Sequence, residues 1–490
     1  MARILNPLVV REGSEFSGLM TEFAFGNMYQ LEPQKMSTVS TALFERNNYM
    51  TVYSYIKQHF PTVYLETDDE WRWSLHGNAE KNLPLVKCSL SSGGSAVSST
   101  DFVGANGTEF YLTFNEPYFS GNAQIVGEMN EVYPILVIGE PMAIGGYWEY
   151  RCRLNSSDNN KFIPYEEVQA GKRFSEDFGP AERSLSRKGT RPKFNSSFEM
   201  RNVFTKIRKE QQYAGNMLSK VMPFAWRSDD GTVHKSFVPY ASYEMLRQWE
   251  ADKARMFMYS TYNGDNNGNF NVPGSNGNII QMGAGIREQI KYGNYQTYNV
   301  FDIEAFSEIL LDLSTDKLGM NNRKFVIATG EWGMYDFSKS LENYSTLYTP
   351  SRDNSRIYTT KDNGMGYKGQ FLEFKGPNGV EITLIHDALK DDKVRNKRMD
   401  PSGKGTLESR TMDILNLSTS DGKSNIQCVE LKGGGDIRRL IEGMRSPQSQ
   451  NGAMKAVSSP IDGWEEHFMF DGGAQVTDST RCLVYEKAVS

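Results

Sequence analysis

The 490-residue chain has few cysteines and lacks the short motifs that mark common catalytic or metal sites. Its cysteines are far apart in the sequence and never form the CxxC pair of zinc or thioredoxin-type sites; they are Cys88, Cys152, Cys428 and Cys482. We therefore expect reduced thiols. The HExxH and GxSxG motifs are absent, and the five histidines are isolated from one another, so we expect each histidine to be structural.

Three segments come close to a ligand-binding motif and then depart from it. In the 263–274 loop, Gly274 stands where a calcium loop needs a bidentate glutamate. Gly283-Ala-Gly285 lacks the third glycine of a dinucleotide fingerprint, and Arg398 replaces the first glycine that a phosphate loop around 402–406 would require. The sequence therefore nominates no catalytic, cofactor-binding or metal-binding residue, although a carboxylate pair formed by the fold would be invisible here.

Long hydrophobic runs are also missing. No stretch approaches the roughly eighteen apolar residues of a transmembrane helix, and the apolar N-terminal run ends at Arg11-Glu12, too early for a signal peptide. We expect a soluble intracellular product with no membrane partner. The net charge of −6 excludes a chain that is basic throughout and coats nucleic acid, although a local basic patch stays compatible with it.

The residues that are present describe a large folded protein with long loops. A hydrophobic content of 38%, with 12% aromatic residues, is enough to build cores, and a chain of this length should divide into two to four lobes. Many of the 44 glycines stand in loops rich in glycine, asparagine and serine. We expect long excursions that project from compact bodies.

The segment 299–344 carries the strongest fold signal, a helix, a strand and a second helix. Asp302 is a predicted N-cap, and the residues behind it share one helical face: Ile303, Phe306, Leu310 and Leu313. Phe325–Ala328 is a short apolar run, typical of a buried strand. The second helix has an apolar face formed by Met334, Phe337 and Leu341.

Other elements are predicted along the rest of the chain. Helices are expected over 38–59 and over 243–257, the latter with Ser242 as cap and with Met245, Trp249 and Met256 on one face. The region 63–165 favours β structure, with strands at 109–114, 133–138 and 147–154. A hairpin is expected around the turn 376–379, a charged excursion over 387–410, and further strands at 414–417, 426–431, 464–470 and 481–485.

The segment 172–209 is strongly basic. It holds eleven lysine and arginine residues against four aspartate and glutamate residues, a local balance of +7. Three interpretations stay open: a solvated loop, a loop that docks on an acidic neighbouring surface, or a nucleic-acid contact. The last is the weakest, because aromatic residues for base stacking are sparse.

The order of these parts resembles a known family. The 243–260 helix, the MGAGIREQI stretch at 282–290, the FVIATG strand, the GMYDFSKSL helix, the hairpin and the closing DGWEEHFMFDGGAQVTDSTRCLVYE follow one another. This order is similar to that of the major capsid proteins of tailed bacteriophages with the Hong Kong 97-type fold, and within them of crAss-like phages. The resemblance is continuous over about 240–490 and looser over 1–240.

The resemblance implies an α+β fold and a self-assembling structural protein, not an enzyme. Hexamers and pentamers would form an icosahedral head shell around double-stranded DNA, without sequence-specific binding, and would meet portal and auxiliary or decoration proteins in the virion. The implied parts are an N-terminal arm and first helix (1–60), a β-rich insertion domain (61–170), an extended basic loop region (171–240), a peripheral domain with a spine helix (241–300), an axial domain (301–440) and a C-terminal return to the peripheral domain (441–490).

Two alternatives stand beside the shell protein. The first is another virion protein of the tail tube, sheath or neck, disfavoured because a long helix and an α/β lobe are unusual there. The second is a cytosolic carbohydrate-active hydrolase, kept because tryptophans occur in the β-rich region at Trp71, Trp73 and Trp148.

Overall fold

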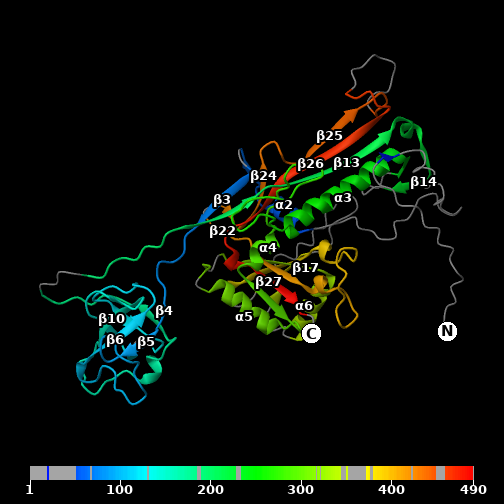
Figure 1. Ribbon diagram of the computed structural model, residues 1–490. Helices are drawn as coiled ribbons and strands as arrows, with labels where there is room; N and C mark the ends of the chain where they lie inside the picture. Colours follow the sequence, from blue (N-terminus) through cyan, green and yellow to red (C-terminus); the bar gives the residue numbers. More distant parts are fainter. Residues whose placement is uncertain are drawn as a thin grey trace. The chain divides into compact units, whose positions relative to one another are not determined.

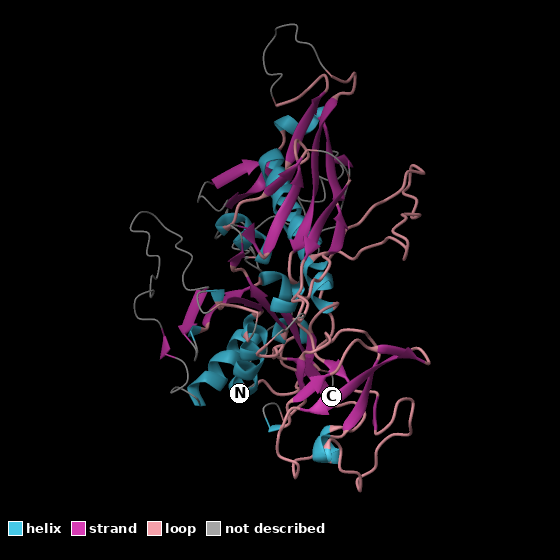
Figure 2. Cartoon of the chain, turned by 90° about the vertical axis from the view of Figure 1, so that its left-hand side faces the viewer, coloured by secondary structure: helices cyan, strands magenta, loops and turns pink. Residues whose placement is uncertain are grey.

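The chain forms two compact units, Ser74–Glu199 and the remainder. The structure is a computed structural model that describes residues 19–20, 51–66, 69–129, 132–184, 189–227, 233–315, 317–319, 322–343, 349–350, 371–375, 379–420, 423–447 and 458–488. The first unit combines the residues that precede and the residues that follow the second unit in the sequence, so the chain leaves one core and later returns to it. Helices and strands are mixed in the first unit, which confirms the α+β class (Figure 2).

A six-stranded sheet builds one part of the first unit. Its strands follow the order β1 (Leu19–Met20), β13 (Thr205–Ala214), β26 (Gly463–Val476), β24 (Ile426–Leu431) and β2 (Val63–Leu65), and β25 (Ile437–Glu442) also pairs with β26. All ten residues of β13 pair antiparallel with residues 463–472 of β26. This long two-stranded ribbon is the surface on which the longest helix packs.

That helix is α3 (Phe237–Tyr259), which runs alongside β13 and β26 (Figure 1). Met245, Trp249 and Met256, predicted to share a face, are buried against Phe468 and Phe470 of β26. The predicted helix is therefore confirmed. The predicted cap is wrong, because α3 begins five residues before Ser242, whose hydroxyl instead donates to Glu466 at 3.0 Å.

A seven-stranded sheet builds the other part of the first unit. Its order is β16 (Tyr295–Tyr298), β27 (Leu483–Lys487), β21 (Met412–Asn416), β17 (Lys324–Thr329), β20 (Glu381–His386), β19 (Phe371–Lys375) and β18 (Thr349–Pro350). Because side chains alternate along a strand, the sheet separates two cores. Phe325 and Ile327 belong to the core with α5 (Ile303–Ser314) and α6 (Glu331–Asn343). Val326 and Ala328 belong to the core with α2 (Val52–His59), the end of α3, and α4 (Ile286–Lys291).

Unit Ser74–Glu199 is an antiparallel β domain with its own core. Its sheet order is β4 (Leu83–Pro84), β11 (Arg173–Glu176), β7 (Gln124–Val126), β8 (Ile135–Val137), β10 (Tyr147–Leu154), β6 (Glu109–Phe114) and β5 (Lys87–Ser89), and β9 (Met142–Ile144) pairs with β10. Phe110, Phe114, Tyr150 and Phe174 are fully buried in this core. The sheet and its loops supply the described core, and the 3-10 helices Ala105–Gly107 and Tyr165–Glu167 are only three residues long.

Three short strand pairs and several short helices lie outside the larger sheets. β3 (Glu70–Leu75) pairs with β12 (Phe198–Val203), β14 (Val221–Arg227) with β15 (Val233–Ser236), and β22 (Thr419–Ser420) with β23 (Lys423–Ser424). Helix α7 (Leu407–Arg410) and the 3-10 helix η9 (Ala388–Lys390) interrupt the charged 387–410 excursion. No helix within the described ranges is long and apolar enough to cross a membrane.

Most of the predicted helices and strands are present, with shifted ends. The strand at 464–470 is one half of the fourteen-residue β26, and the 38–59 helix is described only from Val52, where Thr51 caps it. Asp302 caps α5 by accepting from the Glu304 amide at 3.3 Å, and all four predicted apolar residues of α5 are buried. Residues 376–378 of the predicted turn at 376–379, most of the 1–60 arm and the side chain of Leu341 lie outside the described residues.

The 171–240 region is not a single extended loop. It contains β11 of the β domain, then β12, the long strand β13, and the β14–β15 pair. The sequence does not predict β13, because its charged residues Lys206, Arg208 and Glu210 are typical of a solvated loop. They occupy the solvent face of the strand, while Thr205 and Tyr213 are buried. The closing segment is likewise divided, since β26 joins the six-stranded sheet and β27 joins the seven-stranded sheet.

Candidate functional site

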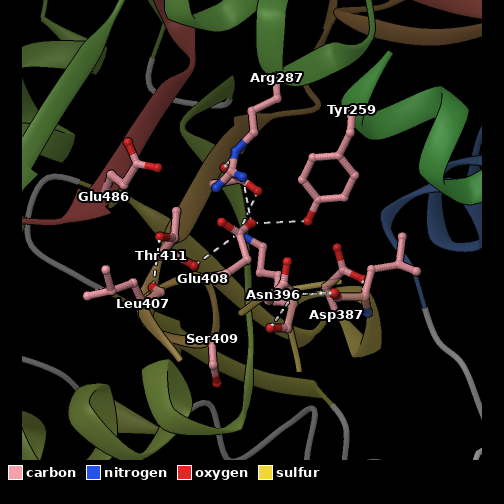
Figure 3. A network of polar contacts seen from close by, with 12 residues as sticks. Tyr259, Arg287, Asp387, Asn396, Leu407, Glu408, Ser409, Thr411 and Glu486 are labelled. Carbon is pink, nitrogen blue, oxygen red and sulfur yellow. Dashed lines mark hydrogen bonds and ion pairs between the residues drawn. The ribbon is translucent and has the colours of Figure 1, made fainter. Parts of the chain in front are cut away.

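The described residues contain a buried ion network on one face of the seven-stranded sheet (Figure 3). Its members come from separate elements: Tyr259 of α3, Arg287 of α4, Asp387 and Lys390 at η9, Glu408 of α7 and Asp413 of β21. Segments more than a hundred residues apart in the sequence therefore meet at one point.

Asp413 is the centre of the network. It lies between Met412 and Ile414, which face the α5–α6 core, so alternation along the strand turns its carboxylate to the opposite face, toward α4 and η9. Its Oδ2 lies 2.6 Å from Lys390 Nζ and its Oδ1 lies 3.3 Å from Arg287 Nε. The side chains of Asp413 and Lys390 are both fully buried.

Two cations keep the Asp413 carboxylate charged. Burial alone would raise its pKa, but the attraction of Arg287 and Lys390 outweighs burial and lowers the pKa. Lys390 also donates to the Thr411 carbonyl at 3.0 Å, so its charge has a second partner. A buried pair of this kind requires both members, because either one alone would be a desolvated charge.

Arg287 connects Asp413 to the rest of the network. Its Nη1 lies 2.5 Å from Glu408 Oε1, and the same oxygen accepts from the Tyr259 hydroxyl at 3.1 Å. The guanidinium also lies over the Tyr259 ring, 5.3 Å from its centroid. One arginine thus joins the end of α3 to α7 and to the central strand β21.

Asp387 has the least favourable environment of the network. It is fully buried, and burial raises its pKa to about 6 even though Lys390 opposes the shift. One carboxylate oxygen accepts from the Leu389 amide at 3.1 Å and caps η9. The other oxygen, Oδ2, has no hydrogen-bond partner among the described residues. The carboxyl group is therefore partly protonated near pH 6.

A second polar cluster lies close by in sequence and holds the start of α6. His386 Nε2 lies 2.6 Å from Asp391 Oδ2, which also accepts from the Glu331 amide at 2.9 Å. The Ser409 hydroxyl donates to the other oxygen of Asp391. The serine here is hydrogen-bonded to the aspartate, whereas in a hydrolytic triad the serine hydroxyl is hydrogen-bonded to the histidine. Asp391 thus acts as a cap for α6, and this geometry does not form a nucleophile.

The two clusters have a structural role. They tie α3 and α4 to β21, α7 and α6, and each charge in the centre faces a charge of opposite sign. The sequence pattern marks none of these residues as part of a site, and His386 is covered only by the expectation that each histidine is structural. The available signal was Asp413 itself, a single acid in the apolar stretch 412–417. Its partners come from distant segments and no local pattern marks them.

A cavity of about 480 Å³ adjoins the network. Glu408 and Thr411 belong to its wall, together with β16 and the end of β27. The remaining wall is basic and comes from the charged excursion, with Arg395, Lys397 and Arg398. The cavity therefore joins a paired interior network to an unusually basic rim.

Comparison with known proteins places the chain among phage capsid proteins. A sequence model of the family described as "Crassvirus major capsid protein" matches residues 2–489. The major capsid protein of Bacteroides phage crAss001 is 32% identical over 488 residues, covering 96% of this chain and 95% of that protein.

Similarity to solved structures is much weaker. The capsid structure of cyanophage P-SCSP1u has a TM-score of 0.31 and 11% identity, covering 64% of this chain and 82% of the other. A chain of Gordonia phage Cozz has a TM-score of 0.32 and 11% identity, covering 64% and 79%. Scores of this size do not establish a common fold, whereas the sequence matches span nearly the whole chain.

Proposed function

Since the chain belongs to the Crassvirus major capsid protein family, we propose that its copies form hexamers and pentamers of an icosahedral head shell that encloses double-stranded DNA. Its role is that of a structural protein of a phage virion, not of an enzyme, and it acts by self-assembly. The family match over residues 2–489 carries this conclusion. The tail, sheath, neck and hydrolase alternatives are set aside by the same match.

We propose a Hong Kong 97-type arrangement of the parts. Helix α3, which packs for most of its length on the β13–β26 ribbon, would be the spine helix of a peripheral domain that also takes residues 441–476. The lobe around the seven-stranded sheet would be the axial domain. Unit Ser74–Glu199 would be the insertion, and it extends the predicted 61–170 boundary toward the C-terminus.

Residues 1–60 and part of 171–240 are proposed as segments that contact neighbouring copies. The β14–β15 pair supports this, because it is a two-stranded ribbon that joins neither larger sheet. Ribbons and arms add contact area without enlarging a core, and specific interfaces generally bury more than about 1,000 Å².

Portal and auxiliary or decoration proteins are proposed as further partners, with DNA held without sequence-specific contacts. The weak net charge of −6 supports the last point. A strongly basic inner wall would bind phosphates tightly through many lysine and arginine contacts.

Electron microscopy of the purified chain tests the proposal. We expect capsomers, tubes or closed shells in negative stain at high protein concentration. Particles that stay monomeric over the whole concentration range, with or without a phage scaffold present, would disprove the shell function. Analytical ultracentrifugation of the same samples provides an independent measure of assembly.

A further inference from the structure

The charged excursion contains basic residues that form no ion pair with any other residue that the structure describes. Five basic residues and one acidic residue lie between positions 393 and 404, and the acid, Asp400, pairs with Arg410 at 3.3 Å. Within the described part of the chain, none of the five has a carboxylate partner, and all are exposed; they are Lys393, Arg395, Lys397, Arg398 and Lys404. We call this set the basic rim.

The basic segment singled out by sequence analysis behaves differently. Its described lysines and arginines mostly have acidic partners in the same chain, including Lys172 with Glu128 at 2.6 Å and Lys209 with Asp252 at 2.7 Å. Lys193 is paired with Glu176 at 2.8 Å. Among the described residues, more unpaired positive charge therefore lies at the basic rim than in the segment with the largest local charge.

In the wall of the cavity beside the basic rim, Arg395, Lys397 and Arg398 have no carboxylate partner among the described residues. Its two acids already have partners: Glu408 contacts Arg287, and Glu486 accepts from the Tyr295 hydroxyl at 2.6 Å and lies 3.3 Å from Lys291. Arg395 lies over the Tyr259 ring at 3.5 Å, which fixes its position at the rim. The wall can therefore accept an anionic group from outside.

Helix α5 carries the complementary feature. Glu304, Glu308 and Asp312 are spaced four residues apart, so they form one stripe on the helix, and all three are exposed. The helix contains no basic residue, and none of the three acids forms an ion pair within the described residues. The stripe spans about 12 Å, since each residue advances the helix by about 1.5 Å. We call it the acidic stripe.

We propose that the acidic stripe of one copy binds the basic rim of the next copy around a capsomer. Figure 1 places α5 at one side of its lobe and the yellow excursion at the other side. Two complementary patches at different places on one subunit make a head-to-tail contact, and such contacts close into rings. The inference rests on the proposed shell function and adds which surfaces form the ring.

A second copy fits these patches better than DNA does. DNA would neutralise the basic rim but would leave three like charges on α5 without partners, in a helix that offers no cation of its own. A neighbouring copy neutralises both features together. Every subunit carries one stripe and one rim, so each ring contact would be satisfied.

A charge-swap experiment on the full chain tests the proposal. The acid variant is Glu308→Lys with Asp312→Lys, which spares the first turn of α5. The base variant is Lys397→Glu with Arg398→Glu, which spares the Arg395 stacking. We expect each variant to lower the capsomer yield at least about tenfold, because like charges would then face each other. The four-substitution chain should recover most of the yield.

Matched controls separate the possible outcomes. Glu80→Lys with Glu166→Lys makes the same change in net charge as the acid variant, on exposed residues of unit Ser74–Glu199, and should leave the yield unchanged. Wild-type chain that forms no capsomers would contradict the shell function itself. Assembly by wild type together with unchanged yields for both variants, or a base variant that loses only DNA retention, would overturn the ring contact. Thermal unfolding of each variant confirms that its fold is intact.

Discussion

At the scale of single residues, the buried ion network sets the most severe constraint. Asp413 and Lys390 are 2.6 Å apart and both fully buried, so neither can be removed alone without leaving a desolvated charge. We predict that Asp413→Asn lowers the free energy of unfolding by roughly 3 to 5 kcal/mol. Chemical denaturation followed by circular dichroism measures this loss.

A double variant separates the effect of an unpaired buried charge from the loss of the hydrogen bonds that the network makes. Asp413→Asn leaves Lys390 and part of the Arg287 charge without a counter-ion, whereas Asp413→Leu with Lys390→Met removes the buried pair as a unit. The double variant should be more stable than Asp413→Asn, because replacing a buried pair with apolar groups is often close to neutral. A double variant that is less stable would mean that the network acts mainly through its hydrogen bonds.

Asp387 gives the chain a pH dependence of opposite sign to that of an ordinary paired carboxylate. Burial raises its pKa in the folded chain to about 6, above the usual aspartate value of 3.8, while Lys390, Asp413 and His386 act on it as neighbouring charges. Between these two values the folded state binds more protons than the unfolded state, so stability falls as pH rises from about 4 to about 6.

We predict that Asp387→Asn removes this part of the pH profile. The side-chain oxygen of the asparagine can still accept from the backbone N–H of Leu389 and cap η9, but the side chain cannot ionise. The melting temperature of the variant should exceed that of the wild type by a few degrees at pH 7 and should approach it at pH 4. Scanning calorimetry at several pH values measures the difference. Parallel profiles for the two proteins would show that Asp387 is not the titrating group.

At the scale of elements, the strength of the local pattern decided what could be predicted. Helix α5 and strands β6 and β10 were found with nearly correct ends, because their apolar residues follow the period of one face and polar residues bound them. Strand β13 was missed, since lysine and arginine on its exposed face dominate the local composition. Helix α3 begins at Phe237, before its predicted start at 243, and Pro239 stands in its first turn, where proline is tolerated.

The candidate site shows the limit of the same approach. Asp413, Arg287 and Lys390 come from three segments, and their contacts follow from strand alternation and from the packing of α4 on the sheet. The basic rim had a visible signal as a charged excursion at 387–410. Whether a charge is paired is a property of the folded chain, so the local composition of 172–209 does not show that most of its described basic residues have acidic partners.

Trp249 is the largest fully buried side chain described in helix α3. Trp249 is 1% exposed, packs against Phe468 and donates to Asp436 at 2.8 Å. Burial opposes ionisation of Asp436, but hydrogen bonds from Arg438, Trp249 and Lys253 lower its pKa to about 2. The indole is therefore part of both the core and an ionised contact.

We predict that Trp249→Asp abolishes soluble, assembly-competent subunits. The substitution would bury a second carboxylate beside Asp436 and remove the largest side chain from the α3–β26 core. We expect the free energy of unfolding to fall by more than about 4 kcal/mol. Trp249→Phe is the matched control, because it keeps an aromatic ring and loses one hydrogen bond, at about 1 to 2 kcal/mol. Electron microscopy counts the particles. Normal particle yields from Trp249→Asp would contradict the role of α3 as the spine helix.

At the scale of the whole molecule, the chain separates assembly surfaces from cores. The first unit holds two sheets and the helices between them, and its proposed ring contacts lie on α5 and on the basic rim. The second unit has a core of its own residues, and the chain enters and leaves it through the paired strands β3 and β12. Insertions with close ends are tolerated because they do not interrupt the host core.

This organisation predicts that unit Ser74–Glu199 folds independently. As a separate polypeptide it should unfold in one cooperative transition, since its sheet is antiparallel and its core includes Phe110, Phe114 and Tyr150, all fully buried. The matching deletion joins Trp73 to Met200 through a short glycine–serine linker and should leave the near-ultraviolet signal of the remaining tryptophans intact. Calorimetry of both polypeptides measures the transitions. If the isolated unit lacks a cooperative transition while the deleted chain unfolds as well, the two units are one folding unit and the insertion assignment fails.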